Sequence, residues 1–308
     1  MGSPEFAVPC LEAIEASSHT VQLVVSQPDR PVGRGRKLCP TAVKAAAEEA
    51  GLPVMTQDRG QDERRRIFAA IKELQPDAVV VVAYGHILRR NLLDLPRHGC
   101  LNVHFSLLPR WRGMSPVQQT LLHGDHWTGV SIMRMDVGVD TGPLLRVAPE
   151  PVDPRETGGE LLTRLGDIGA TELVATLDAL EAGPVPAVEQ GDEGTVYAPS
   201  LSKSMSPIRW DRDCFTVHNQ IRALDPFPGT TSYLADKLLK IGAAEPTGLH
   251  AHGAAPGTVL AVDGAGVEVA CGEGRVRLLA LQAPGRRMLP VDEFLRGFPV
   301  LEGQVFTS

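Results

Sequence analysis

The chain is poor in cysteine, with five in 308 residues, and none of them belongs to a Cys-x-x-Cys pair. An odd number of widely separated cysteines argues against a disulfide framework and against a cysteine-based zinc site, and it indicates reduced thiols. No apolar run approaches the ~20 residues that a membrane-spanning helix needs, and no basic segment precedes an apolar one at the start. The sequence therefore predicts a cytoplasmic protein without a membrane segment.

Positive charge is also in short supply, because 30 Lys and Arg face 37 Asp and Glu, a net charge of -7. Such a balance is unfavourable for a protein that binds nucleic acid over its whole surface. One local exception is the run 30–37, which holds four cations, two glycines and no acid. A basic loop of this kind is usually only solvated, but it can also bind phosphates.

The length of 308 residues favours two domains, and the pattern changes along the chain accordingly. Strand-like runs (20–26, 78–83, 100–106, 129–135) alternate with helix-like runs (41–50, 62–74, 155–182), which predicts an α/β sheet. After a stretch rich in Pro, Gly and Ser come short strand-like runs separated by turns, which indicate a small β-barrel. We expect an α/β domain over 1–183, a linker over 184–206 and a barrel domain over 207–308.

The residues best suited to chemistry lie between Gly99 and Gly142. On a strand over 100–106, alternation places Asn102, His104 and Ser106 on one face. A second strand then leads into a glycine-rich loop, 136–142, which can bring a carboxylate beside the imidazole. An amide, an imidazole and a carboxylate together suit attack by an amine on a carbonyl carbon. Taken singly, each residue could equally be a cap, a turn residue or a satisfied buried histidine.

The string Asn-x-His-x-Ser-Leu-Leu-Pro, followed by Asp-x-Gly-x-Asp-x-Gly, resembles the folate-dependent formyltransferases. Its continuation Arg-Trp-Arg-Gly at 110–113 is most similar to the members that act on methionyl-tRNA. The resemblance implies a doubly wound, mostly parallel Rossmann-like sheet and a C-terminal OB-like barrel that binds tRNA. It also implies that Asn102, His104 and Asp140 are catalytic and that no metal is required. His123, Asp125 and His126 lie close together but are not expected to form a metal site.

The same resemblance extends to the ligands. It implies that residues 106–109 (Ser106, Leu107, Leu108, Pro109) line the site for tetrahydrofolate. Tyr84 and Gly85 follow a buried strand, and ligands gather beyond the carboxyl ends of such strands, so these two are further candidates. Arg34 matches the arginine tied to tRNA recognition, and we group Arg36 and Lys37 with it. Lys203 matches a Leu-Ser-Lys pattern of the family and is a further candidate tRNA contact.

The beginning of the chain departs from the family pattern. A short hydrophobic strand usually precedes the Gly-Ser/Thr-Pro turn, and here the turn starts at Gly2. A doubly wound sheet without an inner strand would leave backbone groups unpaired. The expectation is that the first strand is missing and that translation starts upstream of Met1.

The resemblance implies transfer of a formyl group from 10-formyltetrahydrofolate to methionyl-initiator tRNA in translation initiation, by a monomer. Alternatives with the same three residues are a formyltransferase for a small amine, such as glycinamide ribonucleotide or an amino sugar, and a formylfolate hydrolase. The basic loop and the barrel favour tRNA, because a small metabolite needs neither. A nucleic-acid-binding protein with an inactive α/β domain is a third possibility. A dinucleotide oxidoreductase is disfavoured because no Gly-x-Gly-x-x-Gly follows a strand.

Overall fold

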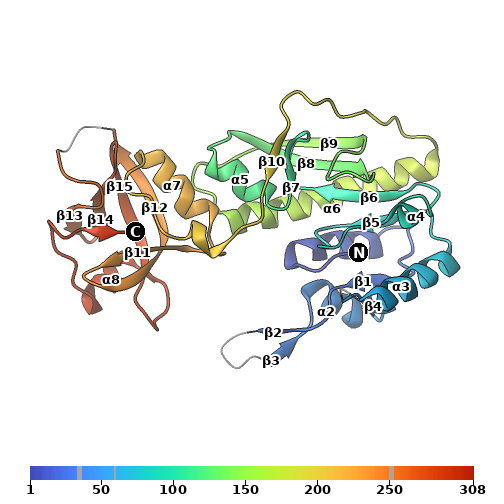
Figure 1. The fold of residues 1–308 in the computed structure, drawn as a ribbon, viewed down its shortest axis with the longest axis horizontal. Coiled ribbons are helices and arrows are strands. Elements are labelled where there is room, and N and C mark those ends of the chain that lie inside the picture. Colours follow the sequence, from blue (N-terminus) through green and yellow to red (C-terminus); the bar gives the residue numbers. More distant parts are fainter. Residues whose placement is uncertain (33–36, 59, 250–252) are drawn as a thin grey trace. The chain divides into compact units, whose positions relative to one another are not determined.

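The computed structural model describes residues 1–32, 37–58, 60–249 and 253–308, and it divides into two compact units (Figure 1). Unit 1 comprises Met1–Gly113, Thr128–Glu150 and Leu162–Tyr197, and unit 2 comprises Met114–Trp127, Pro151–Leu161 and Ala198–Ser308. Residues 184–197, for which the sequence suggested a linker, thus lie in unit 1. Among the described residues, no helix has the length and apolar character needed to cross a membrane.

Unit 1 contains the predicted α/β sheet, whose strands are mostly short. They are β1 (Val24–Ser26), β4 (Val54–Thr56), β5 (Val79–Val81), β6 (Cys100–His104), β8 (Trp127–Arg134) and β9 (Leu144–Pro151). The pairs β1–β4 and β5–β6 are parallel, as predicted, whereas β6–β8 is antiparallel. The order β5-β6-β8-β9 places β6, the strand with the candidate catalytic residues, inside the sheet.

Met1 and Gly2 join the two parts of this sheet. The Gly2 N–H donates to the Val25 carbonyl of β1 at 3.1 Å, and the Val82 N–H beyond β5 donates to the Met1 carbonyl at 2.9 Å. Only these two residues stand where an inner strand would run. Ahead of them a pocket of about 570 Å³ opens between 21–25 and 76–80. Its apolar walls come from helices on both faces of the sheet, and include Cys10, Ile14, Val43, Ile71, Leu74 and Leu177.

The amino group of Met1 is buried at this junction, where it donates to the Val80 carbonyl at 2.6 Å. Burial lowers the pKa of this amino group from 8.0 to about 6. Between pH 6 and 8 the unfolded chain therefore binds more protons than the folded chain, so the free energy of unfolding should rise with pH in this window. The rise should amount to at most ~3 kcal/mol, since each pKa unit corresponds to about 1.4 kcal/mol.

Urea unfolding at pH 6, 7 and 8 measures this dependence. Other groups also titrate there, so the matched control is the same chain with an acetylated amino group, which we expect to lack this part of the slope. If the free energy of unfolding rose equally with pH in the free and the acetylated chain, the Met1 amino group would not be its source.

Helices cover the sheet of unit 1. They are α1 (Val8–Glu15), after the short η1 (Glu5–Ala7), α2 (Ala42–Glu49), α3 (Gln61–Leu74), α4 (Arg90–Leu93) and α6 (Gly158–Ala182). Thr41 is the predicted N-cap of α2 and accepts a hydrogen bond from the Lys44 N–H at 3.2 Å. α6 packs directly against β6, because a Cβ at Gly169 would lie 2.9 Å from Val103. The apolar face of β6 is therefore buried under α6, as its alternation predicted.

Unit 2 contains the predicted barrel, with helices α5 (Pro116–Leu122), α7 (Cys214–Ala223) and α8 (Val291–Gly297) and the turn η2 (Lys203–Met205). Its strands are β11 (Thr230–Leu234), β12 (Lys237–Gly248), β13 (Val259–Asp263), β14 (Gly266–Ala270), β15 (Arg275–Gln282), β16 (Leu289–Pro290) and β17 (Phe306–Thr307). They pair in the order β13-β14-β15-β12-β11-β17. Hydrogen bonds from Val259 to Gln304 and from Phe306 to Gly257, both 2.8 Å, join the two ends, so the sheet closes as predicted.

Candidate active site

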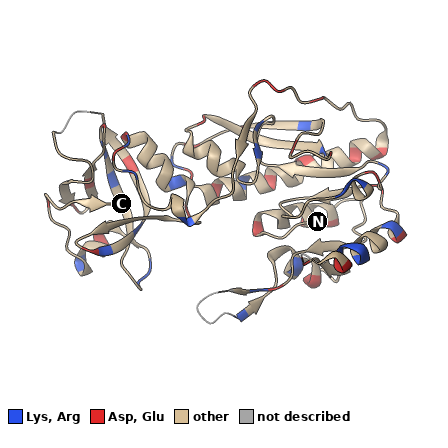
Figure 2. Ribbon diagram, in the orientation of Figure 1, with Lys and Arg blue, Asp and Glu red and all other residues tan. Residues whose placement is uncertain are grey.

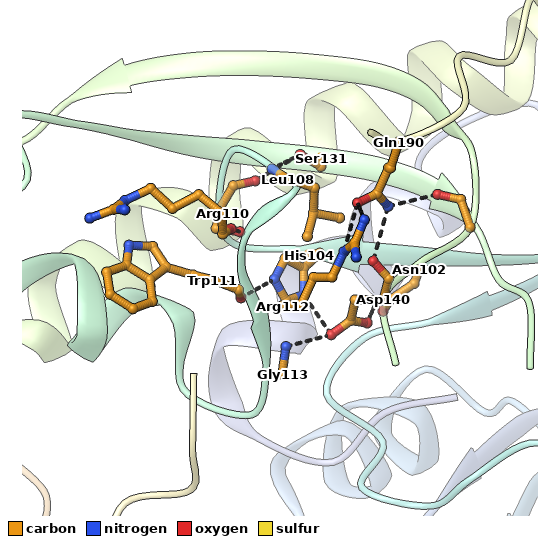
Figure 3. A network of polar contacts seen from close by, with 12 residues as sticks. Asn102, His104, Leu108, Arg110, Trp111, Arg112, Gly113, Ser131, Asp140 and Gln190 are labelled. Carbon is orange, nitrogen blue, oxygen red and sulfur yellow. Dashed lines mark hydrogen bonds and ion pairs between the residues drawn. The ribbon is translucent and has the colours of Figure 1, made fainter. Parts of the chain in front are cut away.

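β6 ends in the polar face that the sequence predicted. Asn102 and His104 are 9% and 5% exposed, and both belong to the network drawn in Figure 3. The Asn102 side chain donates from Nδ2 to Oδ1 of Asp140 at 3.2 Å. Nδ1 of His104 lies 3.6 Å from Oδ2 of the same carboxylate. The structure therefore brings the three candidate catalytic residues together, although Asp140 lies 38 residues beyond Asn102 in the chain.

Asp140 lies in the loop between β8 and β9, and its conformation is unusual. Its φ is +52°, in the left-handed region that few residues other than glycine adopt. Close packing forces the loop into this path, because a Cβ at Gly142 would lie 1.8 Å from the Arg134 carbonyl oxygen. The Asp136 carboxylate at the start of the loop accepts from the Gly138 N–H at 3.0 Å and from the Thr141 hydroxyl at 2.7 Å.

A strand that the sequence did not predict orients both His104 and Asp140. β7 (Arg110–Gly113) pairs with β10 (Val196–Ala198). The Trp111 carbonyl lies 2.9 Å from Nε2 of His104, and the Gly113 N–H donates to Oδ2 of Asp140 at 2.8 Å (Figure 3). In the sequence, Arg-Trp-Arg-Gly stands out only as part of a family resemblance. A backbone carbonyl and a backbone amide leave no signal in the residue types.

The Trp111 carbonyl decides which nitrogen of His104 is available for chemistry. A carbonyl can only accept, so Nε2 is inferred to carry a proton. Nδ1 is then the nitrogen that can exchange a proton with a substrate, on the side that faces Asp140. Asn102 has a second amide N–H besides the one given to Asp140. Asn102 and His104 can thus donate hydrogen bonds to an oxyanion, and the Asp140 carboxylate can accept a proton.

Residues 106–109 follow β6 directly and are held by internal hydrogen bonds. The Ser106 hydroxyl donates to the Arg110 carbonyl at 2.7 Å. The Ser131 hydroxyl donates to the Ser106 carbonyl at 2.7 Å and accepts from the Leu108 N–H at 3.3 Å. Ser106 and Leu108 are buried, whereas Leu107 and Pro109 are half-buried. The Ser106 hydroxyl therefore already has a hydrogen-bond partner within the segment. Leu107 and Pro109 are the more accessible residues of the four.

Tyr84 and Gly85 follow β5, as predicted, but the Tyr84 ring points into the core. Its side chain is 1% exposed, and its hydroxyl donates to Oε1 of Gln57 at 2.6 Å. The Tyr84 carbonyl accepts from Nε2 of Gln27 at 2.9 Å. Gly85 has a φ of +79°, and a Cβ there would lie 2.6 Å from the Gln27 amide nitrogen, so a side chain would strain the backbone and displace the Gln27 amide.

The basic segment of the sequence is only partly described. Its two ends form an antiparallel hairpin of β2 (Arg30–Val32) and β3 (Lys37–Cys39) in unit 1. Lys37 is exposed there, whereas Arg34 and Arg36 lie outside the described residues. Lys203 is exposed at the start of η2 in unit 2. Cationic residues also occur along the barrel, interspersed with acidic ones (Figure 2).

Neither a cysteine nucleophile nor a metal site is evident near β6 among the residues that the structure describes. Burial raises the pKa of the Cys100 thiol to about 12, as it does for Cys10 of α1, so both thiols stay protonated at neutral pH. Within the residues that the structure describes, no group of three or more His, Cys, Asp or Glu side chains is arranged to hold a metal ion. That no metal takes part remains an expectation.

Comparisons with known proteins agree with the fold and extend over the whole chain. A family model described as formyl transferase matches residues 1–177, and one described as formyl transferase, C-terminal domain, matches residues 200–299. The methionyl-tRNA formyltransferase of Aromatoleum aromaticum is 47% identical over 100% of this chain and 96% of its own length. That of Gluconobacter oxydans is 45% identical over 98% of this chain and 97% of its own length.

Solved structures share the fold at lower identity. The sugar 3N-formyl transferase WlaRD, with dTDP and 5-N-formyl-THF, has a TM-score of 0.65 and 16% identity, covering 93% of this chain and 97% of that one. HypX from Aquifex aeolicus in complex with tetrahydrofolic acid has a TM-score of 0.58 and 18% identity, covering 84% of this chain and 47% of that one. Because the two family models span most of the chain and both relatives align along nearly all of it, the chain belongs to the methionyl-tRNA formyltransferases.

Proposed function

We propose that this protein transfers the formyl group of 10-formyltetrahydrofolate to the free amino group of methionyl-initiator tRNA. The observation that carries the proposal is the convergence of Asn102, His104 and Asp140 at the end of β6, in a chain of this family. The amine attacks the formyl carbon, and a tetrahedral intermediate forms with a negatively charged oxygen. The second amide N–H of Asn102 and the Nδ1–H of His104 in its charged form stabilise that oxygen.

Asp140 accepts the proton that the amine loses, directly or through a water molecule. Its carboxylate is suited to this role because Asn102 and the Gly113 amide hold one oxygen each. The intermediate then collapses: the bond between the formyl carbon and N10 of the folate breaks, and N10 takes up the proton that Asp140 had accepted. The products are the N-formylated amine and tetrahydrofolate. Binding both substrates in contact supplies a further part of the rate enhancement, because it turns an encounter of two molecules into a step within one complex.

For the folate we propose the segment 106–109 and the backbone around Gly85. The Tyr84 side chain is left out, since it is buried and its hydroxyl is hydrogen-bonded to Gln57. For the tRNA we propose Arg34, Arg36 and Lys37 of the basic run 30–37, together with Lys203. Cations can bind phosphates of the RNA backbone, and Lys37 and Lys203 are exposed. The domain limits of 1–183, 184–206 and 207–308, and a monomeric state, are part of the same proposal.

A substrate competition tests the function. Purified protein is given 10-formyltetrahydrofolate and, in separate reactions, charged initiator methionyl-tRNA, glycinamide ribonucleotide or an amino sugar nucleotide. We expect N-formylmethionyl-tRNA at a kcat/KM at least about 10³-fold above that for either small amine, a ratio worth roughly 4 kcal/mol of differential binding to the transition state. Faster formylation of a small amine, or formate release that is independent of any amine, would overturn the proposal.

A further inference from the structure

Gln190 takes part in the network around Asp140, although it lies in a stretch for which the sequence suggested only a linker. Its Nε2 donates to the Asp140 carbonyl at 3.0 Å and to the Gly142 carbonyl at 2.7 Å (Figure 3). Its Oε1 accepts from Nε and Nη2 of Arg112 at 3.0 and 2.9 Å. One carboxamide thus connects the loop that carries the candidate base to the strand β7.

The orientation of this carboxamide is determined by its partners. A guanidinium can only donate and a carbonyl can only accept, so the Gln190 oxygen must face Arg112 and its nitrogen must face the loop. Arg112 is 4% exposed, and it also reaches the Gly191 carbonyl at 3.4 Å. Because the guanidinium is buried, an unsatisfied partner there would be costly, which favours the arrangement described.

The chain around Gln190 is fixed on both sides. Val188 and Leu144 exchange two backbone hydrogen bonds of 2.8 Å each at the start of β9. After Gln190, β10 pairs with β7. The segment 188–198 therefore runs as a strap from β9 to β7, and Gln190 points from it to the loop. A side chain on a strap anchored at both ends can hold a neighbouring loop in one place.

The loop needs such support, because Asp140 has a φ of +52°. A non-glycine residue keeps this conformation only where its surroundings impose it. The hydrogen bonds from Gln190 hold the backbone carbonyls of Asp140 and Gly142. We propose that Gln190 is a positioning residue for formyl transfer, which holds the Asp140 backbone so that the carboxylate faces His104. This inference rests on the proposed function of Asp140.

The decisive variant is Gln190→Glu, which keeps the size of the side chain and replaces the two N–H donors by an acceptor. The carboxylate keeps Arg112 as a partner but repels the carbonyl oxygens of Asp140 and Gly142. We expect kcat to fall about 10- to 100-fold, consistent with the loss when a catalytic group is misplaced. KM values for 10-formyltetrahydrofolate and methionyl-tRNA should stay within about threefold, because the side-chain hydrogen bonds of Gln190 go to Arg112, Asp140 and Gly142, which are not among the residues proposed to bind folate or tRNA.

A double-mutant cycle separates positioning from a general structural role. If Gln190 acts through Asp140, then Gln190→Glu should change kcat by less than about twofold when Asp140 is already Asn. The matched control is Gln220→Glu in unit 2, since Gln220 also donates to two carbonyls, those of Met205 and Pro207, at 2.9 and 2.8 Å. It is expected to lower the melting temperature without changing kcat.

Absence of formyl transfer by the unaltered protein would refute the proposed function, whereas normal kcat in Gln190→Glu, or losses that add in the cycle, would overturn the positioning role alone. Should Gln190→Glu fail to fold, Gln190→Met removes the same two donors and carries the same expectations. Hydrogen exchange of the Gly113 amide, which bonds to Asp140, gives a readout without substrate: we expect at least tenfold faster exchange in the variant.

Discussion

Replacing Asp140 with Asn should lower kcat by about 10²- to 10⁴-fold, the range that a general acid or base contributes. The carboxylate accepts from Asn102 on Oδ1 and from the Gly113 amide on Oδ2. A carboxamide has one acceptor oxygen, so it meets one of these two donors with its own NH₂ group, and it cannot take the proton of the attacking amine. KM for 10-formyltetrahydrofolate should stay within a few-fold. Single-turnover assays with methionyl-tRNA measure the remaining activity.

Asp136→Asn provides a matched control in the same loop. Both bonds of that carboxylate, from Gly138 and Thr141, go to a single oxygen, Oδ1, which an Asn side chain can reproduce. We expect kcat within about threefold of the original protein. If Asp140→Asn retained full kcat, or if both variants lost it equally, the role assigned to Asp140 would have to be abandoned.

Adding an extended apolar segment in front of Met1 should raise the melting temperature of the protein by roughly 6–12 °C, because each kcal/mol shifts the melting temperature by about 2–4 °C in a unit of this size. Such a segment would enter the pocket of about 570 Å³ between 21–25 and 76–80. Val25 and Val80 already bond to Gly2 and Met1 through carbonyl groups, and in a parallel ladder every second residue faces the same neighbour. The carbonyls of Leu23 and Ala78 therefore face the pocket.

Five residues of Val and Ile would place apolar side chains against the helices on both faces. Each side chain contributes about 1.5–3 kcal/mol on burial, against about 1.5 kcal/mol for ordering a residue, which leaves a net gain of about 3 kcal/mol. The control is a Gly-Ser segment of equal length, which offers the same backbone bonds but no side chains. Calorimetry compares the two. Equal melting temperatures would show that the pocket does not take a strand.

The helices and the polar face of β6 could be predicted because their signals are local. Thr41 is an N-cap in front of an alanine-rich run, and alternation by two placed Asn102 and His104 together. Strand lengths were less predictable, since a strand exists only where it has a partner. The run 20–26 is a strand only over Val24–Ser26, and its earlier residues line the pocket instead.

The support of the site could not be predicted, because it consists of backbone groups and distant side chains. Nothing in Arg-Trp-Arg-Gly indicates that the Trp111 carbonyl faces His104. Gln190 meets Asp140 across 50 residues, from a stretch whose Pro and Gly content is typical of a linker. Asp140 itself was singled out through the family resemblance, since a glycine-rich loop alone leaves open which carboxylate approaches the imidazole.

The left-handed backbone at two network residues limits how this protein can be made more heat-resistant. Six non-glycine residues of the described chain have positive φ, and Trp111 and Asp140 are two of them, at +65° and +52°. At Asp140, screens for thermal tolerance would favour glycine, because it adopts this conformation without a steric penalty. At Trp111, glycine would relieve the backbone but remove a buried ring, and the cavity would destabilise the fold. Glycine at 140 would also delete the carboxylate. Engineering for robustness with retained turnover should therefore leave both positions alone and alter the chain elsewhere.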